Sequence, residues 1–205
     1  TKQNFKETVR LKSMHIGTYF IIPLLVFCIT PIITLVNAVS MLFVKNYVSS
    51  TITYVVTNNS FLLTLGLMAL MPAIVEELAF RGVILGNYRY SGALSGILMS
   101  GFLFGLMHMN FNQMAYAVLL GIIFGIVLEA TGSIISTIEM HFCINGSSVL
   151  LSYVSQALFS GKDYQSVNSQ CQLDAASLHT IINSYINILP YALVFSCLLI
   201  YALAA

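Results

Sequence analysis

Three charged side chains stand together in a segment that is otherwise almost entirely apolar. Glu76, Glu77 and Arg81 interrupt the apolar run Leu62–Leu85. Each such charge at the centre of a membrane-spanning helix costs on the order of 3 kcal/mol. Glu77 and Arg81 are four residues apart and share a helix face, so we expect an ion pair with a mainly structural role. Glu76 is rotated by about 100° from that face, which leaves its carboxylate free to face a cavity.

Two histidines and an asparagine lie in other apolar segments. His108 follows Phe104 by four residues, and His141 precedes Asn145 by four residues, so that each pair shares a helix face. A buried carboxylate can take a proton from water, while imidazole and amide N–H groups can donate to an oxyanion. Either histidine alone is equally well explained as an interhelical hydrogen-bonding residue, and Phe104 as packing that shapes a pocket. The combination with Glu76 is what predicts a hydrolytic site.

The composition predicts that these residues lie in a lipid bilayer. The 205 residues include eight Lys and Arg and seven Asp and Glu, hydrophobic residues make up 58%, and the mean hydropathy is +0.89. Charged residues are 7% of the chain, whereas an ordinary soluble domain has about 25%. The net charge of +1 and the lack of a basic stripe argue against nucleic acid as a partner. We therefore expect an integral membrane protein.

Long stretches without charge predict an all-α, polytopic helical bundle with about six transmembrane helices. Each uncharged stretch exceeds the roughly 20 residues that a helix needs to cross a bilayer. The expected spans are about Ile16–Phe43, Ser60–Asn87, Gly92–Met109, Gln113–Glu129, Ser133–Ser155 and Leu178–Leu203. We expect one domain over residues 1–205, with a motif-bearing core at about residues 60–155. Small residues such as Gly101 and Gly121 are expected to let neighbouring helices approach closely.

Basic residues before the first span favour a cytoplasmic N-terminal end. They are Lys2, Lys6, Arg10 and Lys12. Alternating spans then place Arg89 inside, and Lys45 and Lys162 outside. Glu139 also falls within a span, and the sequence predicts no partner for it.

Helix geometry brings the polar residues to similar depths. Counted from the turn at Tyr88–Gly92 with a rise of about 1.5 Å per residue, Glu76 lies roughly 20 Å and His108 roughly 25 Å from one surface. Counted from the next turn on that side, His141 lies roughly 14 Å deep and Asn145 roughly 20 Å deep. We therefore expect three helices to bring these side chains to one site.

The three motifs resemble those of the CPBP family, which comprises CAAX proteases and bacteriocin-processing enzymes and is also called Abi or type II CAAX prenyl endopeptidases. The similar motifs, within about Ser60–Ser155, are Glu76-Glu77-x-x-x-Arg81, Phe104-x-x-x-His108 and His141-x-x-x-Asn145. The resemblance implies an all-helical intramembrane protease. It implies that Glu76 is the base that activates water, with His108, His141 and Asn145 around the tetrahedral intermediate. It also implies that Glu77 and Arg81 support the first motif.

The donor set leaves zinc as an open alternative, since two histidines and a glutamate are a known zinc-binding combination. The lack of an HExxH motif and the resemblance, which implies a metal-independent glutamate protease, favour a site without a cofactor. The expected substrate is a peptide or small membrane-associated protein, such as a secreted signal or bacteriocin-like peptide. Small size and the Ile-, Asn- and Tyr-rich composition suggest a bacterial cell membrane.

Two interpretations without proteolysis stay open. A membrane scaffold or bacteriocin-immunity protein would keep the pocket but not use it for catalysis. A proton-coupled transporter would use Glu76, Glu77 and His108 as a relay. The transporter is disfavoured because the sequence has no internal inverted repeat.

Overall fold

The computed structural model describes residues 9–44, 48–158 and 175–204, and these residues form helices and no β-strand. This confirms the predicted all-α membrane bundle. Five helical stretches are long and apolar enough to cross a membrane: α2 (Ile16–Met41), Phe61–Ser91, α8 (Phe111–Thr131), α9 (Ile134–Leu158) and Ala176–Ala204 of α11 (Ala175–Ala204). The expectations for Lys2, Lys6, Lys45 and Lys162 fall outside the described residues.

The remaining predicted span is present but short. Helix α7 (Ala93–Met107) has 15 residues and so measures about 22 Å, less than the roughly 30 Å of a hydrocarbon core. It begins after Gly92, whose φ of 110° only glycine adopts without strain, and it ends before Met109, with φ of 47°. Helix α7 is therefore too short to cross a bilayer by itself.

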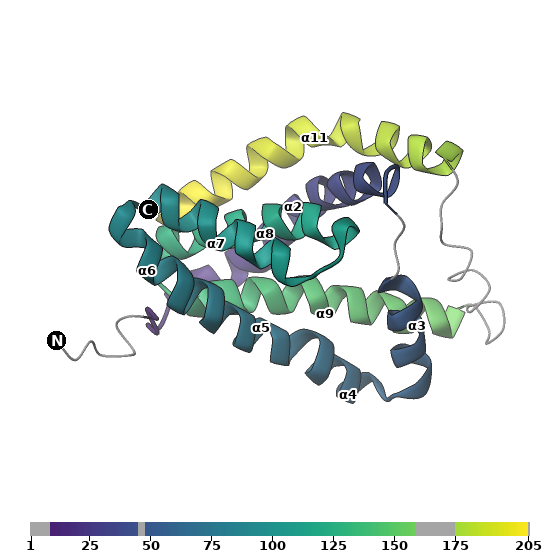
Figure 1. Ribbon diagram of the computed structural model, residues 1–205, viewed down its shortest axis with the longest axis horizontal. Coiled ribbons are helices and arrows are strands. Elements are labelled where there is room, and N and C mark those ends of the chain that lie inside the picture. Colours follow the sequence, from purple (N-terminus) through teal and green to yellow (C-terminus); the bar gives the residue numbers. More distant parts are fainter. Residues whose placement is uncertain (1–8, 45–47, 159–174, 205) are drawn as a thin grey trace.

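The stretch Phe61–Ser91 is one long rod in which π-helix alternates with α-helix (Figure 1). In chain order it consists of α4 (Phe61–Leu65), η1 (Gly66–Leu70), α5 (Met71–Glu77), η2 (Leu78–Leu85), α6 (Gly86–Tyr88) and η3 (Arg89–Ser91). The segments η1 and η2 are π-helical and flank α5, which carries both glutamates of the first motif. Such π-helical turns are rare and concentrate at functional sites.

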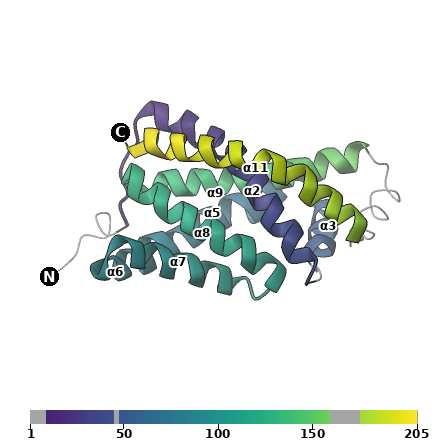
Figure 2. The same ribbon diagram turned by 90° about the horizontal axis from the view of Figure 1, so that it is seen from above.

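Close backbone contact joins α7 to α8, as the small residues predict. A Cβ added at Gly121 would lie 2.7 Å from the Cα atom of Gly101, so neither position tolerates a side chain without moving the helices apart. Helices α2, α8 and α9 form the middle of the bundle, and α11 packs mainly on α2 (Figure 2). A short helix that the sequence did not predict, α3 (Val48–Asn58), packs on α9 and α4.

Ion pairs define one end of the bundle. Arg10 and Arg89 both contact Glu129, with N–O distances of 3.2 and 3.0 Å. This agrees with the predicted placement of both arginines on one side of the membrane. We call this the inner end, and we call the opposite end, where α3 lies beside the end of α9, the outer end (Figure 1).

Candidate active site

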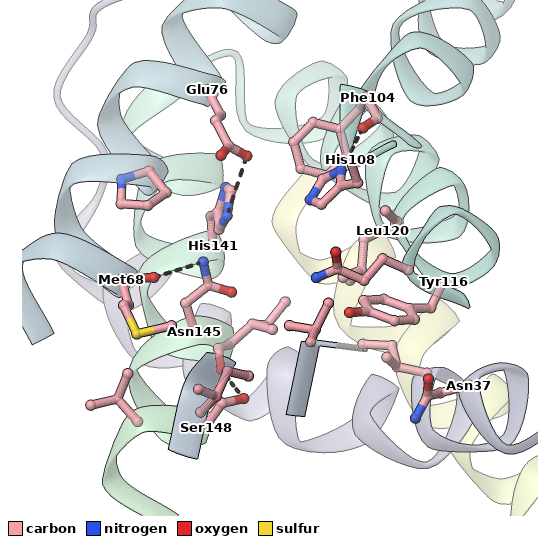
Figure 3. Close-up of a pocket in the computed structure, with 18 of the residues that line it drawn as sticks. Asn37, Met68, Glu76, Phe104, His108, Tyr116, Leu120, His141, Asn145 and Ser148 are labelled. Atoms are coloured by element: carbon pink, nitrogen blue, oxygen red, sulfur yellow. Dashed lines mark hydrogen bonds and ion pairs between the residues drawn. The ribbon is translucent and has the colours of Figure 1, made fainter. Parts of the chain in front are cut away.

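The four residues expected to be catalytic line one pocket. Glu76 from α5, His108 at the end of α7, and His141 and Asn145 from α9 all contribute to a cavity of about 480 Å³. Figure 3 shows two walls, with Glu76, His141 and Asn145 on one and His108 with Phe104 on the other. The structure therefore brings together the residues that the sequence grouped.

The His141 ring is held between two carboxylates. Its Nδ1 lies 3.0 Å from Oε1 of Glu77, a distance at which Nδ1–H donates to the carboxylate. Its Nε2 lies 3.9 Å from Oε2 of Glu76. The ring also stacks on Phe124, with 5.3 Å between centroids and 27° between planes. These contacts fix the ring so that Nε2 is the nitrogen directed to Glu76 and the pocket.

A fully buried arginine supports Glu77. The predicted i,i+4 pair is present, with Nε of Arg81 3.2 Å from Oε2 of Glu77, and both side chains are inaccessible to solvent. Nη2 of Arg81 donates to the carbonyl of Gly121 at 3.1 Å. The guanidinium lies 4.4 Å from the ring centroid of Phe104 and 4.9 Å from that of Phe124, within cation–π range. A series of contacts, from the Gly121 carbonyl to Arg81 and from Arg81 to Glu77, thus orients His141.

His108 is oriented by its own helix. Its Nδ1 lies 2.8 Å from the carbonyl oxygen of Phe104, so Nδ1–H donates there and Nε2 points into the pocket (Figure 3). The Phe104 ring is buried and meets the rings of both His108 and His141 edge-on. Phe104 therefore sets the spacing of the two imidazoles, as its expected role in shaping the pocket requires.

A proline explains the orientation of Asn145. Met68 lies in the π-helical segment η1, four residues before Pro72, which has no N–H to donate to a carbonyl of the preceding turn. Nδ2 of Asn145 donates to the Met68 carbonyl at 3.3 Å. An amide nitrogen carries two hydrogens, so the second N–H and the carbonyl oxygen of Asn145 remain for the pocket (Figure 3).

Other polar residues of the pocket were not predicted, and the carboxylate of Glu139 lies outside it. Tyr116 and Gln113 line the pocket from α8, and the sequence predicts neither of them as a site residue. Glu139 does not line it, and its buried Oε2 has no hydrogen-bond partner in the described part of the chain. Glu139 thus stays without a partner.

The described residues do not form a metal site. Within residues 9–44, 48–158 and 175–204, no three His, Cys, Asp or Glu side chains are grouped so that they could hold a metal ion. Both Nδ1 atoms of the pocket histidines are engaged by protein oxygens, which leaves their Nε2 atoms facing the pocket, and Arg81 pairs with Glu77. No catalytic step is assigned to a metal.

Comparison with known families supports the resemblance carried by the motifs. The family described as type II CAAX prenyl endopeptidase Rce1-like matches residues 57–147, a range that contains all three motifs. No curated protein and no solved structure matched the chain. Protease activity in general follows from the family, and the apolar helices show an integral membrane protein. Residues 57–147 of this chain are thus similar to the Rce1-like type II CAAX prenyl endopeptidases.

Proposed function

We propose that the protein is an intramembrane endopeptidase that hydrolyses a peptide bond without a resident metal. Its substrate is a peptide or small membrane-associated protein, and its location is the cell membrane of a bacterium. The main support is the shared pocket, in which Glu76 faces two imidazoles and an amide. Arg81 contacts Glu77, the other glutamate of the first motif. The one carboxylate in the pocket is thus the one without an arginine partner among the described residues.

The proposed reaction uses Glu76 as the base. A water oxygen attacks the scissile carbonyl carbon while Glu76 takes one of the water protons, and the carbonyl π electrons form an oxyanion. The free N–H of Asn145 donates to this oxyanion, and the Nε2 atoms of His108 and His141 face it from two sides. The C–N bond then breaks, and the proton held by Glu76 passes to the leaving nitrogen. The products are a carboxylate and an amine.

The test uses purified protein in lipid nanodiscs with a pool of small secreted peptides, and mass spectrometry of the products. The substitution Glu76→Gln is expected to lower the cleavage rate by a factor of about 10²–10⁴, because a neutral amide cannot accept the proton of the attacking water. Glu139→Gln is the matched control, since it removes an intramembrane carboxylate that does not line the pocket. Chelator is expected to leave the rate unchanged. Wild-type rates for Glu76→Gln, or an equal loss for Glu139→Gln, would contradict the proposal.

A further inference from the structure

The turn between α7 and α8 carries His108 but is fixed by little apolar packing. His108 is the C-terminal cap of α7, and α8 begins three residues later at Phe111. The side chains of Met109 and Phe111 are 95% and 71% exposed, so neither anchors the turn in the bundle. Met109 also has φ of 47°, a left-handed conformation that costs a residue with a Cβ atom about 1–2 kcal/mol. Other contacts must therefore hold the turn in place.

Asn112 supplies such contacts from the first turn of α8, where it is almost fully buried. Its Nδ2 donates to Oδ1 of Asn37 at 3.2 Å and to Oγ of Ser40 at 2.7 Å, and both acceptors lie on α2. The hydroxyl of Ser40 donates in turn to the Asn37 carbonyl at 2.9 Å. The backbone N–H of Asn112 donates to Oδ1 of Asn110, the N-terminal cap of α8. We call Asn37, Ser40 and Asn112 the polar clamp.

The polar clamp ties the turn to α2, whereas α7 is tied to α8. The close contact of Gly101 with Gly121 joins these two helices into a hairpin, and the turn is the tip of this hairpin. The pocket separates the tip from Glu76 on α5. Figure 3 shows Asn37 on the same side of the cavity as Tyr116 of α8. The polar clamp therefore holds the tip at the side of the pocket that faces away from Glu76.

The position of the tip sets the distance from the His108 imidazole to Glu76. The hydrogen bond from Nδ1 of His108 to the Phe104 carbonyl orients the ring on α7, but it does not place the end of α7 relative to the opposite wall. A displacement of about 1 Å in an active site can lower the rate about 10²-fold. Polar contacts between membrane helices can also serve packing alone. A role in turnover must therefore appear as a change in geometry at the site.

We propose that Asn112 is a positioning residue, which through the polar clamp holds the α7–α8 turn against α2 and so sets the distance from the His108 imidazole to Glu76. Neither Asn112 nor Ser40 lines the pocket, so both act through His108 and not on the substrate. Asn112 lies outside the three motifs, and the sequence predicts no site role for it. This inference rests on the proposed peptidase function, because it concerns the geometry of the same site.

The first measurement does not depend on hydrolysis. Spin labels are attached at Met109→Cys in the turn and at Val75→Cys on α5, both exposed positions, in a protein whose four natural cysteines are replaced by alanine. Pulsed electron paramagnetic resonance in nanodiscs gives the distance between the labels. A shifted or broader distance distribution is expected when Asn112→Ala is added. The milder Ser40→Ala, which removes one acceptor of the clamp, is expected to act in the same direction and serves if Asn112→Ala does not fold.

Steady-state kinetics of the unlabelled variants test the consequence for the reaction. Asn112→Ala is expected to lower kcat about tenfold and Ser40→Ala about threefold, because each displaces His108 by a fraction of an ångström or more. The value of KM should change less than about twofold, since neither residue lines the pocket. A loss of packing alone would lower the amount of folded protein and would leave kcat per folded molecule unchanged.

Ser136→Ala is the matched control. Ser136 is also buried, and its hydroxyl lies 2.7 Å from that of Thr131, so that it joins the inner end of α8 to α9. This variant is expected to keep the label distance and kcat of its parent. The inference is overturned by an unchanged distance distribution or an unchanged kcat in the clamp variants, by a loss confined to KM, or by equal changes in Ser136→Ala. If the wild-type protein cleaves no peptide, the proposed function fails, while the label distance still reports on the clamp.

Discussion

The inner and outer halves of the bundle are built in different ways. Towards the inner end, Arg81 is fully buried, Gly101 touches Gly121, and a Cβ at Gly82 would lie 3.0 Å from a methyl carbon of Val9. Towards the outer end, the same helices enclose a cavity of about 480 Å³ whose walls carry both apolar and polar side chains. The first motif spans this boundary, with Arg81 on the packed side and Glu76 in the cavity. Substitutions in the inner half should therefore change stability first, and those in the outer half should change turnover or binding.

The largest expected effect is that of Arg81→Ala on stability. The substitution leaves the Glu77 carboxylate buried without its arginine partner and removes the cation that lies over Phe104 and Phe124. Breaking a buried ion pair from one side costs about 3–5 kcal/mol. We expect a loss of this size in the free energy of unfolding, measured by denaturation in detergent and by thermal unfolding.

Arg89→Ala is the matched control for this prediction. Arg89 also pairs with a glutamate, at 3.0 Å, but its side chain is 45% exposed. Exposed ion pairs contribute about 0–1 kcal/mol, so the expected loss is small. Equal losses for the two variants would show that burial does not distinguish these two ion pairs, and the prediction for Arg81 would then fail.

A smaller effect of opposite sign on stability is expected for Pro72→Ala. The alanine supplies a backbone N–H for the Met68 carbonyl and so competes with Nδ2 of Asn145. Proline costs about 3 kcal/mol in a helix interior, so the variant should unfold at a higher temperature. Its kcat should fall about tenfold. One oxyanion donor contributes a factor of about 10²–10³ to kcat, and a misdirected donor loses part of that factor. Steady-state kinetics and thermal unfolding measure the two effects.

A double-mutant cycle separates an effect of Pro72 on the orientation of Asn145 from a general change in the helix. If Pro72 acts through Asn145, Pro72→Ala has no further effect on kcat in an Asn145→Ala background. Pro190→Ala is the control, since Pro190 is also inside a helix but lies in α11, which does not line the pocket. Additive losses of kcat in the double variant would contradict the proposed role of Pro72.

The contrast between the halves also explains what the sequence could predict. The Glu77–Arg81 pair follows from spacing alone, and the shared pocket of Glu76 and His108 follows from the depths of apolar helices whose lengths are set by the bilayer. The hydrogen bond from His141 to Glu77 could not be predicted, because it depends on the rotation of α9 about its axis.

Other features of the outer half gave weaker signals. Helix α3 is rich in β-branched residues, which have low helix propensity, and its packing on α9 and α4 supplies the missing stability. The π-helical turns on either side of α5 contain Met68 and Phe80, whose carbonyls accept hydrogen bonds from Asn145 and Ser100 of other helices. Tyr116 lies near the start of a largely apolar helix, and nothing in the sequence distinguishes it from an interfacial tyrosine.

The smallest expected effect is that of Ile52→Ala in α3. Ile52 forms part of the outer wall of the pocket, at a distance along the chain from every residue of the three motifs. Truncation removes apolar contact with a bound segment, and the loss of a few partly buried methyl groups corresponds to about a threefold rise in KM. The value of kcat should not change, because the residues around the oxyanion keep their contacts. Tyr54→Ala, on the exposed face of the same helix, should change neither constant. A fall in kcat at constant KM would mean that α3 acts on the chemical step, and the outer half could then no longer be described as a binding region separate from the packed inner half.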